Sequence, residues 1–273
     1  MSHRPQRTND SPKSRTAAES LGARTYWVRS MRPLHVLVFL LPLLVAFEVG
    51  SIYFLSNPAT GLQQRTIEAE RVMTDFFRII GATGSLMPCI ALATVLLVWH
   101  IMSRDGWILH LKTLAGMFAE VAAWTLPLLV LSAGIEHARA AAAFGDVAML
   151  PTLAPDTTDR LRDLPLGTRL TLSIGAGLYE EMLFRLIGLA VLHFILADLI
   201  ALPQKWASIL AVVLSALAFA AYHQPVLPRD WAKTIFYILS GIYFGTVYVL
   251  RGFGIVVGTH ALYDVLVLAV LAG

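Results

Sequence analysis

Three charged residues interrupt an apolar stretch of the sequence, "LYEEMLFRL" at residues 178–186. On a helix, Glu181 and Arg185 are four residues apart with the acid on the N-terminal side, which is the favourable order for an ion pair. Glu180 is turned about 100° away from Glu181 and has no arginine partner on its own helix. Because a charge inside a membrane costs roughly 2.5 to 3.5 kcal/mol, we interpret Glu180 as a candidate functional carboxyl group. The pair of Glu181 and Arg185 is expected to fix helix packing.

Two later apolar stretches also contain polar side chains. In "FAAYHQP", Phe219 and His223 are one helical turn apart, and in "GTHALYDVL", His260 and Asp264 share one helix face. The acid is then close enough to orient the imidazole ring, or both groups can face one small site. A single histidine in a membrane helix usually forms a hydrogen bond between helices, so each histidine alone also has a packing interpretation.

Membrane helices must position these side chains. Apolar residues make up 57% of the 273 residues and charged ones 14%, and the mean hydropathy is +0.67, which exceeds the usual range of a water-soluble domain. Apolar runs recur at residues 34–55, 79–102, 114–135, 170–200, 208–222, 234–250 and 253–271. Most of them reach the roughly 20 residues that a helix needs to cross a bilayer, and they lack the alternation of membrane strands. The sequence therefore predicts an all-α fold, a polytopic transmembrane bundle of about seven to eight helices.

Small residues in these runs allow the helices to approach one another. Gly241 and Gly245 have the small-xxx-small spacing, and Gly175 and Gly177 lie shortly before Glu180. We expect such contacts to bring the carboxyl group and the two histidines together.

The remaining sequence divides the chain into four parts. Residues 1–32 form a basic tail with seven Lys or Arg and two acidic residues, which we expect to be disordered and, by the positive-inside rule, cytoplasmic. The net charge of +3 arises in this tail, so it does not indicate nucleic-acid binding. Residues 33–135 are expected to form three transmembrane helices, residues 136–169 an extramembrane loop, and residues 170–273 the four-helix core with the polar groups. Cys89 is the only cysteine, which excludes an intrachain disulfide and leaves packing as its expected role.

The polar residues form three motifs. "EEMLFR" from Glu180 to Arg185 fits EExxxR, "FAAYH" from Phe219 to His223 fits FxxxH, and "HALYD" from His260 fits HxxxN/D. In this order, on successive membrane helices, they resemble the CAAX-protease and bacteriocin-processing family of intramembrane endopeptidases. That family includes the type II CAAX prenyl endopeptidases and the abortive-infection proteins. The resemblance covers residues 170–273, and it implies hydrolysis of a peptide bond inside the membrane.

On this resemblance, Glu180 is the general base that activates a water molecule. His223 shares the water or carries its proton to the leaving amine, and His260, with Asp264 beside it, donates a hydrogen bond to the oxyanion. Asp264 stands where the prenyl endopeptidases have Asn. The residues expected to support this site without touching the substrate are Glu181, Arg185 and Phe219.

A metal site uses the same atoms. Glu180, His223 and His260 would serve as three zinc ligands with an open fourth position. The sequence contains no HExxH motif, so we favour the metal-free mechanism with no cofactor and keep zinc as the alternative.

Two further classes of function remain open. A catalytically inactive membrane protein that binds a partner or confers immunity would keep the polar residues for packing. A proton-coupled transporter would use them as a relay, although no inverted repeat is detectable. For the protease, we expect a membrane-associated peptide or protein as substrate, the lipid bilayer as environment, and a bacterial inner membrane as location.

Overall fold

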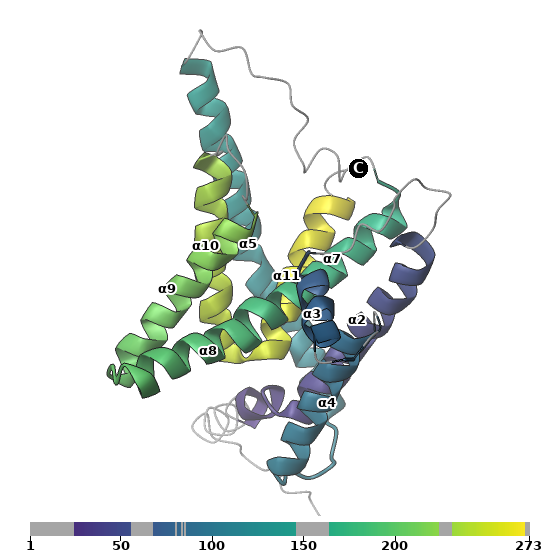
Figure 1. Ribbon diagram of the computed structural model, residues 1–273. Helices are drawn as coiled ribbons and strands as arrows, with labels where there is room; N and C mark the ends of the chain where they lie inside the picture. Colours follow the sequence, from purple (N-terminus) through teal and green to yellow (C-terminus); the bar gives the residue numbers. More distant parts are fainter. Residues whose placement is uncertain are drawn as a thin grey trace, which may run out of the picture.

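The computed structural model describes residues 25–55, 68–79, 81–82, 84, 86–145, 164–223 and 231–270. All regular secondary structure in these ranges is helical (Figure 1). A helical segment at residues 25–30 comes first. The longer elements, of which the η segments are π-helical, are α2 (Pro33–Gly50), η1 (Ser51–Leu55), α3 (Glu68–Ile79), α4 (Met87–Met102), α5 (Leu111–Gly145), α7 (Leu166–Glu181), η3 (Met182–Leu189), α8 (Ala190–His193), η4 (Phe194–Leu199), α9 (Gln204–His223), α10 (Trp231–Arg251), α11 (Phe253–Val265) and η5 (Leu266–Val270).

Five helices are long and apolar enough to cross a membrane. They are Pro33–Leu55, Leu111–Ala141, Leu166–Leu199, Gln204–His223 and Trp231–Arg251. Two shorter apolar helices, Met87–Met102 and Phe253–Leu268, accompany them in the described part of the chain. Many large apolar side chains are exposed on the outer surface, as expected for helices in contact with lipid. These observations confirm the predicted polytopic all-α bundle.

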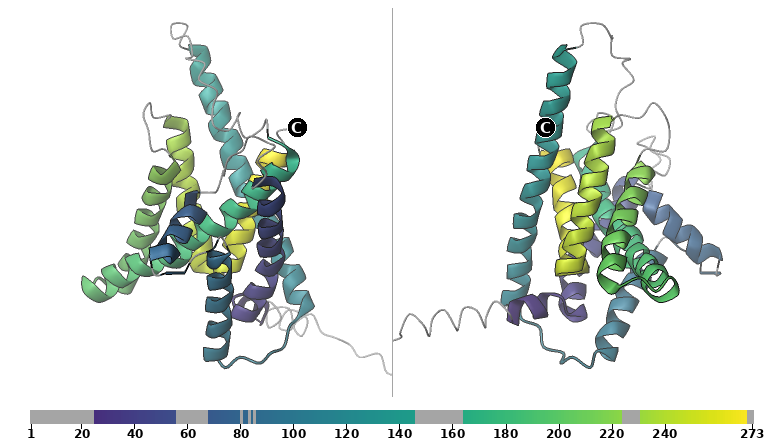
Figure 2. Two further views of the ribbon diagram at one scale, coloured as in Figure 1. Left: turned by 45° about the vertical axis from the view of Figure 1, so that its right-hand side comes forward. Right: turned by 90° about the vertical axis from the view of Figure 1, so that its left-hand side faces the viewer.

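Helix α11 lies in the middle of this bundle. Ten of its thirteen residues are buried, so it is enclosed on all sides rather than along one stripe. It packs against α7, α5, α10 and α2, and two further views show it between these helices (Figure 2). The helix that carries His260 and Asp264 is therefore the centre of the fold.

Glycines allow the helices around the site to approach closely. A Cβ atom added to Gly177 on α7 would lie 2.7 Å from the backbone nitrogen of Ala261 on α11. A Cβ atom on Gly241 of α10 would lie 2.9 Å from the Cα atom of Ala216 on α9. Gly245 is similarly close to a side chain of α9. The prediction that small residues permit these approaches is confirmed for these three positions.

The N-terminal region differs from the predicted division. Residues 1–24 of the basic tail lie outside the described residues, whereas residues 25–30 are helical rather than disordered. The reason is a tertiary contact at the end of α10. The guanidinium of Arg251 lies 3.6 Å from the ring centre of Trp27 and donates a hydrogen bond of 2.8 Å to Ser30.

Two other boundaries also shift. The segment expected as a loop at residues 136–169 is partly helical, because α5 continues to Gly145 and α7 begins at Leu166. The alanine-rich sequence at residues 138–143 favours a helix there. Residues 68–79, for which no helix was predicted, form α3, an amphipathic helix that buries Ala69, Glu70 and Met73. Helix α3 packs against α4 and α7.

Candidate functional site

Three helices bring Glu180, His223 and His260 together. Glu180 lies near the end of α7, His223 is the last residue of α9, and His260 lies on α11. The Oε2 atom of Glu180 is 3.4 Å from Nε2 of His223 and 3.9 Å from Nε2 of His260. The structure thus places the predicted base and both predicted histidines in one site, at distances that a single water molecule can bridge.

Glu181 connects three helices. Its Oε1 atom is 3.0 Å from Nη1 of Arg185 and 2.7 Å from Nδ1 of His260. Nη2 of Arg185 in turn donates a hydrogen bond of 3.2 Å to the carbonyl oxygen of Gly241 on α10. The predicted pair of Glu181 and Arg185 is confirmed. The bond to His260 was not predicted, because spacing along one helix carries no information about a neighbouring helix.

Asp264 lies near Nε2 of His260, whereas Glu181 binds Nδ1 of the same ring. Its Oδ2 atom is 3.6 Å from Nε2 of His260, the nitrogen that also faces Glu180. The hydrogen bond that holds the ring in place is therefore the one from Nδ1 to Glu181. Asp264 is near the reacting groups, as predicted, but Glu181 has the better geometry for orienting His260.

The backbone fixes the tautomer of His223. Its Nδ1 atom is 2.9 Å from the carbonyl oxygen of Phe219, one turn earlier on α9. A carbonyl oxygen only accepts hydrogen bonds, so Nδ1 carries a proton and donates it. In the neutral ring, Nε2 then has a free lone pair, and this is the atom that faces Glu180.

Aromatic rings enclose the two histidines. Tyr237 stacks on His223 with ring centres 4.2 Å apart, and Phe244 stacks on His260 with ring centres 4.5 Å apart. Both aromatic residues come from α10, seven residues apart, with Gly241 between them. Sequence reasoning missed them, although this shared helix face next to a close-contact glycine was an available signal.

Phe219, predicted as a supporting residue, contacts both Arg185 and His223. Its ring centre is 4.4 Å from that of His223, and the guanidinium carbon of Arg185 lies 4.4 Å above the ring. A cation over an aromatic face is attracted by the ring quadrupole. Phe219 therefore helps to hold Arg185 away from His223.

The site is closed on most sides. Glu180 is 6% exposed and His260 5%, while the side chains of His223 and Asp264 are 19% and 20% exposed. A substrate would therefore meet the site where His223 and Asp264 reach the surface. Charges removed from water in this way interact more strongly than at a surface.

The described residues offer no ready metal site. In this part of the chain, no three His, Cys, Asp or Glu side chains are arranged to hold a metal ion. The zinc alternative, with Glu180, His223 and His260 as ligands, therefore stays a prediction.

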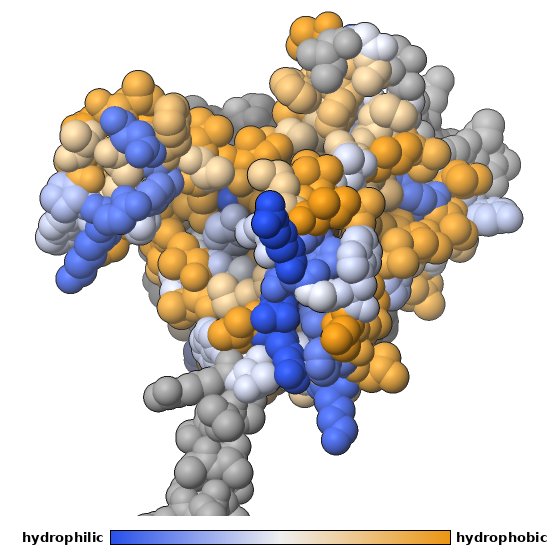
Figure 3. All heavy atoms as spheres, turned by 90° about the horizontal axis from the view of Figure 1, so that it is seen from below, coloured by the Kyte–Doolittle hydropathy of each residue, from blue (hydrophilic) through white to orange (hydrophobic). Residues whose placement is uncertain are grey.

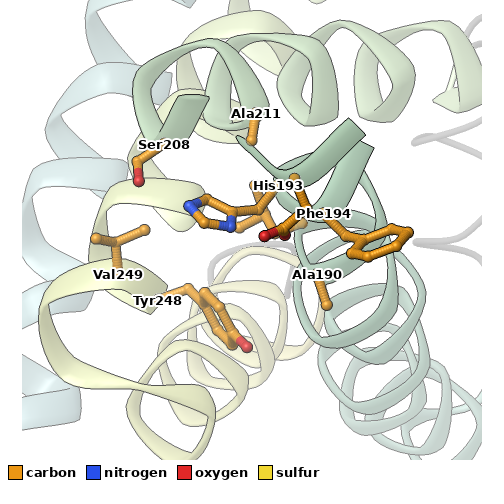
Figure 4. A pocket seen from close by; sticks show the side chains of 9 residues that line it. Ala190, His193, Phe194, Ser208, Ala211, Tyr248 and Val249 are labelled. Atoms are coloured by element: carbon orange, nitrogen blue, oxygen red, sulfur yellow. The ribbon is translucent and has the colours of Figure 1, made fainter. Parts of the chain in front are cut away.

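A separate cleft of about 440 Å³ opens between α8, α9 and α10. Figure 4 shows the ring of His193 in this cleft, with Ser208 and Tyr248 on either side. No residue of the predicted site lines it. The candidate site is thus a buried contact of side chains and not part of this cleft.

A second buried polar cluster adjoins the site on α7. The hydroxyl of Tyr179 donates a hydrogen bond of 3.2 Å to Glu48 on α2, and Cys89 on α4 lies beside Glu48. Glu70 on α3 is 4% exposed, and burial together with the negative charge of Glu48 raises its pKa to about 7. The sequence analysis assigned Cys89 to packing and missed this cluster. The signal was the acid at position 48 within the first apolar run.

Comparison with known proteins agrees with this site. Residues 163–266 match the family model described as Type II CAAX prenyl endopeptidase Rce1-like. The match contains all three motifs, from Glu180 to Asp264. No curated protein and no solved structure matches the chain. The family match confirms the resemblance seen in the sequence and, with the apolar helices, supports an intramembrane protease at the level of the family. Residues 163–266, which carry the candidate site, are thus similar to the Rce1-like type II CAAX prenyl endopeptidases.

Proposed function

We propose that this protein is an intramembrane endopeptidase that hydrolyses a peptide bond by means of a water molecule activated by Glu180. One observation carries the proposal. The buried Oε2 atom of Glu180 lies 3.4 Å from Nε2 of His223 and 3.9 Å from Nε2 of His260, and the three residues come from three different helices. A nucleophilic water needs a general base, and peptide cleavage also needs a proton donor for the leaving amine and a donor for the oxyanion.

Glu180 and His223 are the groups for proton transfer. Glu180 removes a proton from water while the water oxygen attacks the peptide carbonyl carbon. His223 Nε2, 3.4 Å from the carboxylate, accepts this proton on its free lone pair and passes it to the leaving nitrogen as the C–N bond breaks. The carbonyl of Phe219 keeps the ring in the required orientation during both steps.

His260 is the group for the oxyanion. When its ring carries both protons, Nδ1 donates to Glu181 and Nε2 is left to donate to the oxygen of the tetrahedral intermediate. Removing one donor of this kind typically lowers the rate by about a hundredfold or more. Asp264, 3.6 Å from the same Nε2, borders the position of that oxygen.

Glu181, Arg185 and Phe219 position these groups without touching the substrate. The 2.7 Å bond from His260 to Glu181 fixes the ring, and Arg185 holds Glu181 at 3.0 Å. Arg185 itself is held by Phe219 and by the carbonyl oxygen of Gly241. The proposed mechanism assigns no step to a metal ion or a cofactor.

The substrate is a peptide or protein associated with the membrane, and the proposed location is a bacterial inner membrane. What supports the first statement is the position of the site. It lies among helices that can cross a bilayer, so a lipid-anchored or membrane-spanning chain reaches it more directly than a soluble one.

The test compares membrane proteins from cells that produce the full chain or its Glu180→Gln variant. New chain ends, identified by terminal proteomics, are expected with the parent protein and absent with Glu180→Gln, His223→Ala or His260→Ala. The matched control is Glu136→Gln, since the side chain of Glu136 is 68% exposed on α5. All variants must be present in the membrane at the parent level.

The same cleavage pattern in Glu180→Gln would remove the core of the mechanism. Identical chain ends in the parent and in cells without the protein would favour the inactive binding protein. Uptake of a solute into vesicles driven by a proton gradient would favour the transporter.

A further inference from the structure

A basic cleft lies at the lower end of the bundle, apart from the candidate site. Its volume is about 540 Å³, and its walls come from residues 25–32 and from the loop before α5. Its polar lining comes from Thr25, Arg29, Arg32 and His110, and Val28 and Ile108 are among its apolar residues. Seen from below, hydrophilic side chains gather across the middle of this face, with apolar ones around them (Figure 3).

The positive charge of this cleft is only partly matched by acidic residues. Arg29 has no carboxylate partner among the described residues. Arg32 has one, Asp105, at 3.7 Å, with 40% of the arginine side chain exposed. Such a distant, exposed pair contributes little, so both guanidinium groups can serve another anion. Planar guanidinium groups bind phosphate oxygens in bidentate fashion.

Two stacked imidazole rings add unused hydrogen-bonding atoms beside the cleft. His35 and His110 are stacked with ring centres 5.7 Å apart, and the backbone N–H of His110 donates to Nε2 of His35. The Nδ1 atoms of both rings are buried and have no hydrogen-bond partner among the described residues. Buried polar atoms are rarely left without a partner, and His110 forms part of the cleft wall.

The surroundings of the cleft place it at the edge of the membrane. The first apolar span begins at Pro33, directly after Arg32. Trp27 and Trp107 are 48% and 66% exposed beside the cleft, and Val28 and Ile108 are 58% and 66% exposed. Tryptophan is enriched at the depth of lipid headgroups. A ligand here meets arginines on its polar part and apolar side chains on the rest.

We propose that this cleft binds the phosphate headgroup of an anionic phospholipid, whose acyl chains lie against Val28 and Ile108. Arg29 and Arg32 hold the phosphate, and His110 forms part of the wall beside it. A free inorganic phosphate would satisfy the arginines but would leave the apolar side chains exposed.

The experiment titrates phosphatidylglycerol into the full chain, purified in an uncharged detergent, and follows bound lipid by native mass spectrometry. Phosphatidylcholine and inorganic phosphate are titrated in parallel. Phosphatidylglycerol is expected to bind more tightly than either. Each of Arg29→Gln and Arg32→Gln should weaken its binding about fivefold, and the double variant about 25-fold. Lys112→Gln is the matched control, because Lys112 is an exposed cation at the start of α5 that does not line the cleft.

The outcomes separate the sources of the anion. Equal binding of phosphatidylglycerol and phosphatidylcholine, or no loss in Arg29→Gln, would overturn the proposal. Inorganic phosphate binding as tightly as phosphatidylglycerol would replace the lipid by a free anion and overturn it as well. Arg29 has no described acidic partner, so its variant does not break an ion pair of the fold. The double variant, Arg29→Gln with Arg32→Gln, gives a second measurement of lipid binding at the same cleft.

Discussion

Replacing Arg185 with alanine removes a cation that is in contact with three helices. The arginine side chain is fully buried, and so is its partner Glu181 on α7. Its other contacts are the carbonyl oxygen of Gly241 on α10 and the ring of Phe219 on α9. The substitution therefore leaves the carboxylate of Glu181 inside the bundle without its compensating charge.

The expected loss of stability follows from these contacts. Removing one partner of a buried ion pair costs about 3 to 5 kcal/mol. In this site, Glu181 keeps the hydrogen bond from Nδ1 of His260 at 2.7 Å, so the remaining carboxylate is not left entirely without a donor. We therefore expect the lower part of that range, about 3 kcal/mol. Arg185→Lys keeps the charge but loses the planar fork, and its loss should be intermediate.

The assay is unfolding of the purified full chain in a mild detergent, by heat or by titration with a denaturing detergent. The matched control is Arg78→Ala. Arg78 pairs with Asp75 at 3.1 Å on α3, and the two side chains are 67% and 52% exposed. Exposed pairs contribute little, so the control should unfold like the parent. Glu180→Gln should also cost less than Arg185→Ala, because Glu180 does not neutralise a buried arginine at hydrogen-bond distance.

The reasoning would be refuted if Arg185→Ala reached the membrane at the parent level and unfolded at the same point as Arg78→Ala. Such a result would mean that the bundle relaxes around Glu181 or that the carboxyl group becomes neutral without cost.

Three further predictions concern packing, pH and metal. Gly177→Ala should destabilise the protein and lower activity, because its Cβ atom would lie 2.7 Å from backbone of α11, whereas Gly134→Ala has no atom within 4 Å and should leave unfolding in detergent unchanged or slightly improved. Because the pKa of Glu70 is raised to about 7 in the fold, the folded protein holds this proton more tightly than the unfolded chain. The resulting stability should be complete below about pH 4.5 and be lost by about pH 7, and melting of Glu70→Gln should lack this part of the pH dependence. Activity of the purified enzyme should survive exhaustive chelation, and Asp264→Asn should retain most of it; activity that is lost to a chelator and restored by zinc would contradict the metal-free mechanism.

The candidate site residues were predictable because they are polar or charged residues within apolar stretches of the sequence. A glutamate or a histidine in an apolar run is costly, so Glu180, His223 and His260 stood out without any structure. The pair of Glu181 and Arg185 was also predictable, since both residues lie on one helix at a fixed spacing. The family match at residues 163–266 spans the same motifs.

Contacts between helices were not predictable in the same way. The bond from His260 to Glu181 depends on how α7 and α11 are rotated against each other, and periodicity along either helix leaves this rotation open. The stacking of Tyr237 on His223 likewise depends on how α9 and α10 are rotated against each other. The helix at residues 25–30 depends on Arg251, more than 200 residues later in the chain. Helix α3 was missed because its mixed composition gives no long apolar run.

The central position of α11 has a consequence for how the enzyme is made. This helix follows α7, α9 and α10 in the chain, so during synthesis the helices that surround it enter the membrane first. Until α11 joins them, Glu181 has only Arg185 as a partner, and Glu180 faces a space without His260 or Asp264. A nascent chain that has reached α10 therefore holds the base but not the group for the oxyanion. If the proposed mechanism holds, cleavage is expected only after α11 has inserted.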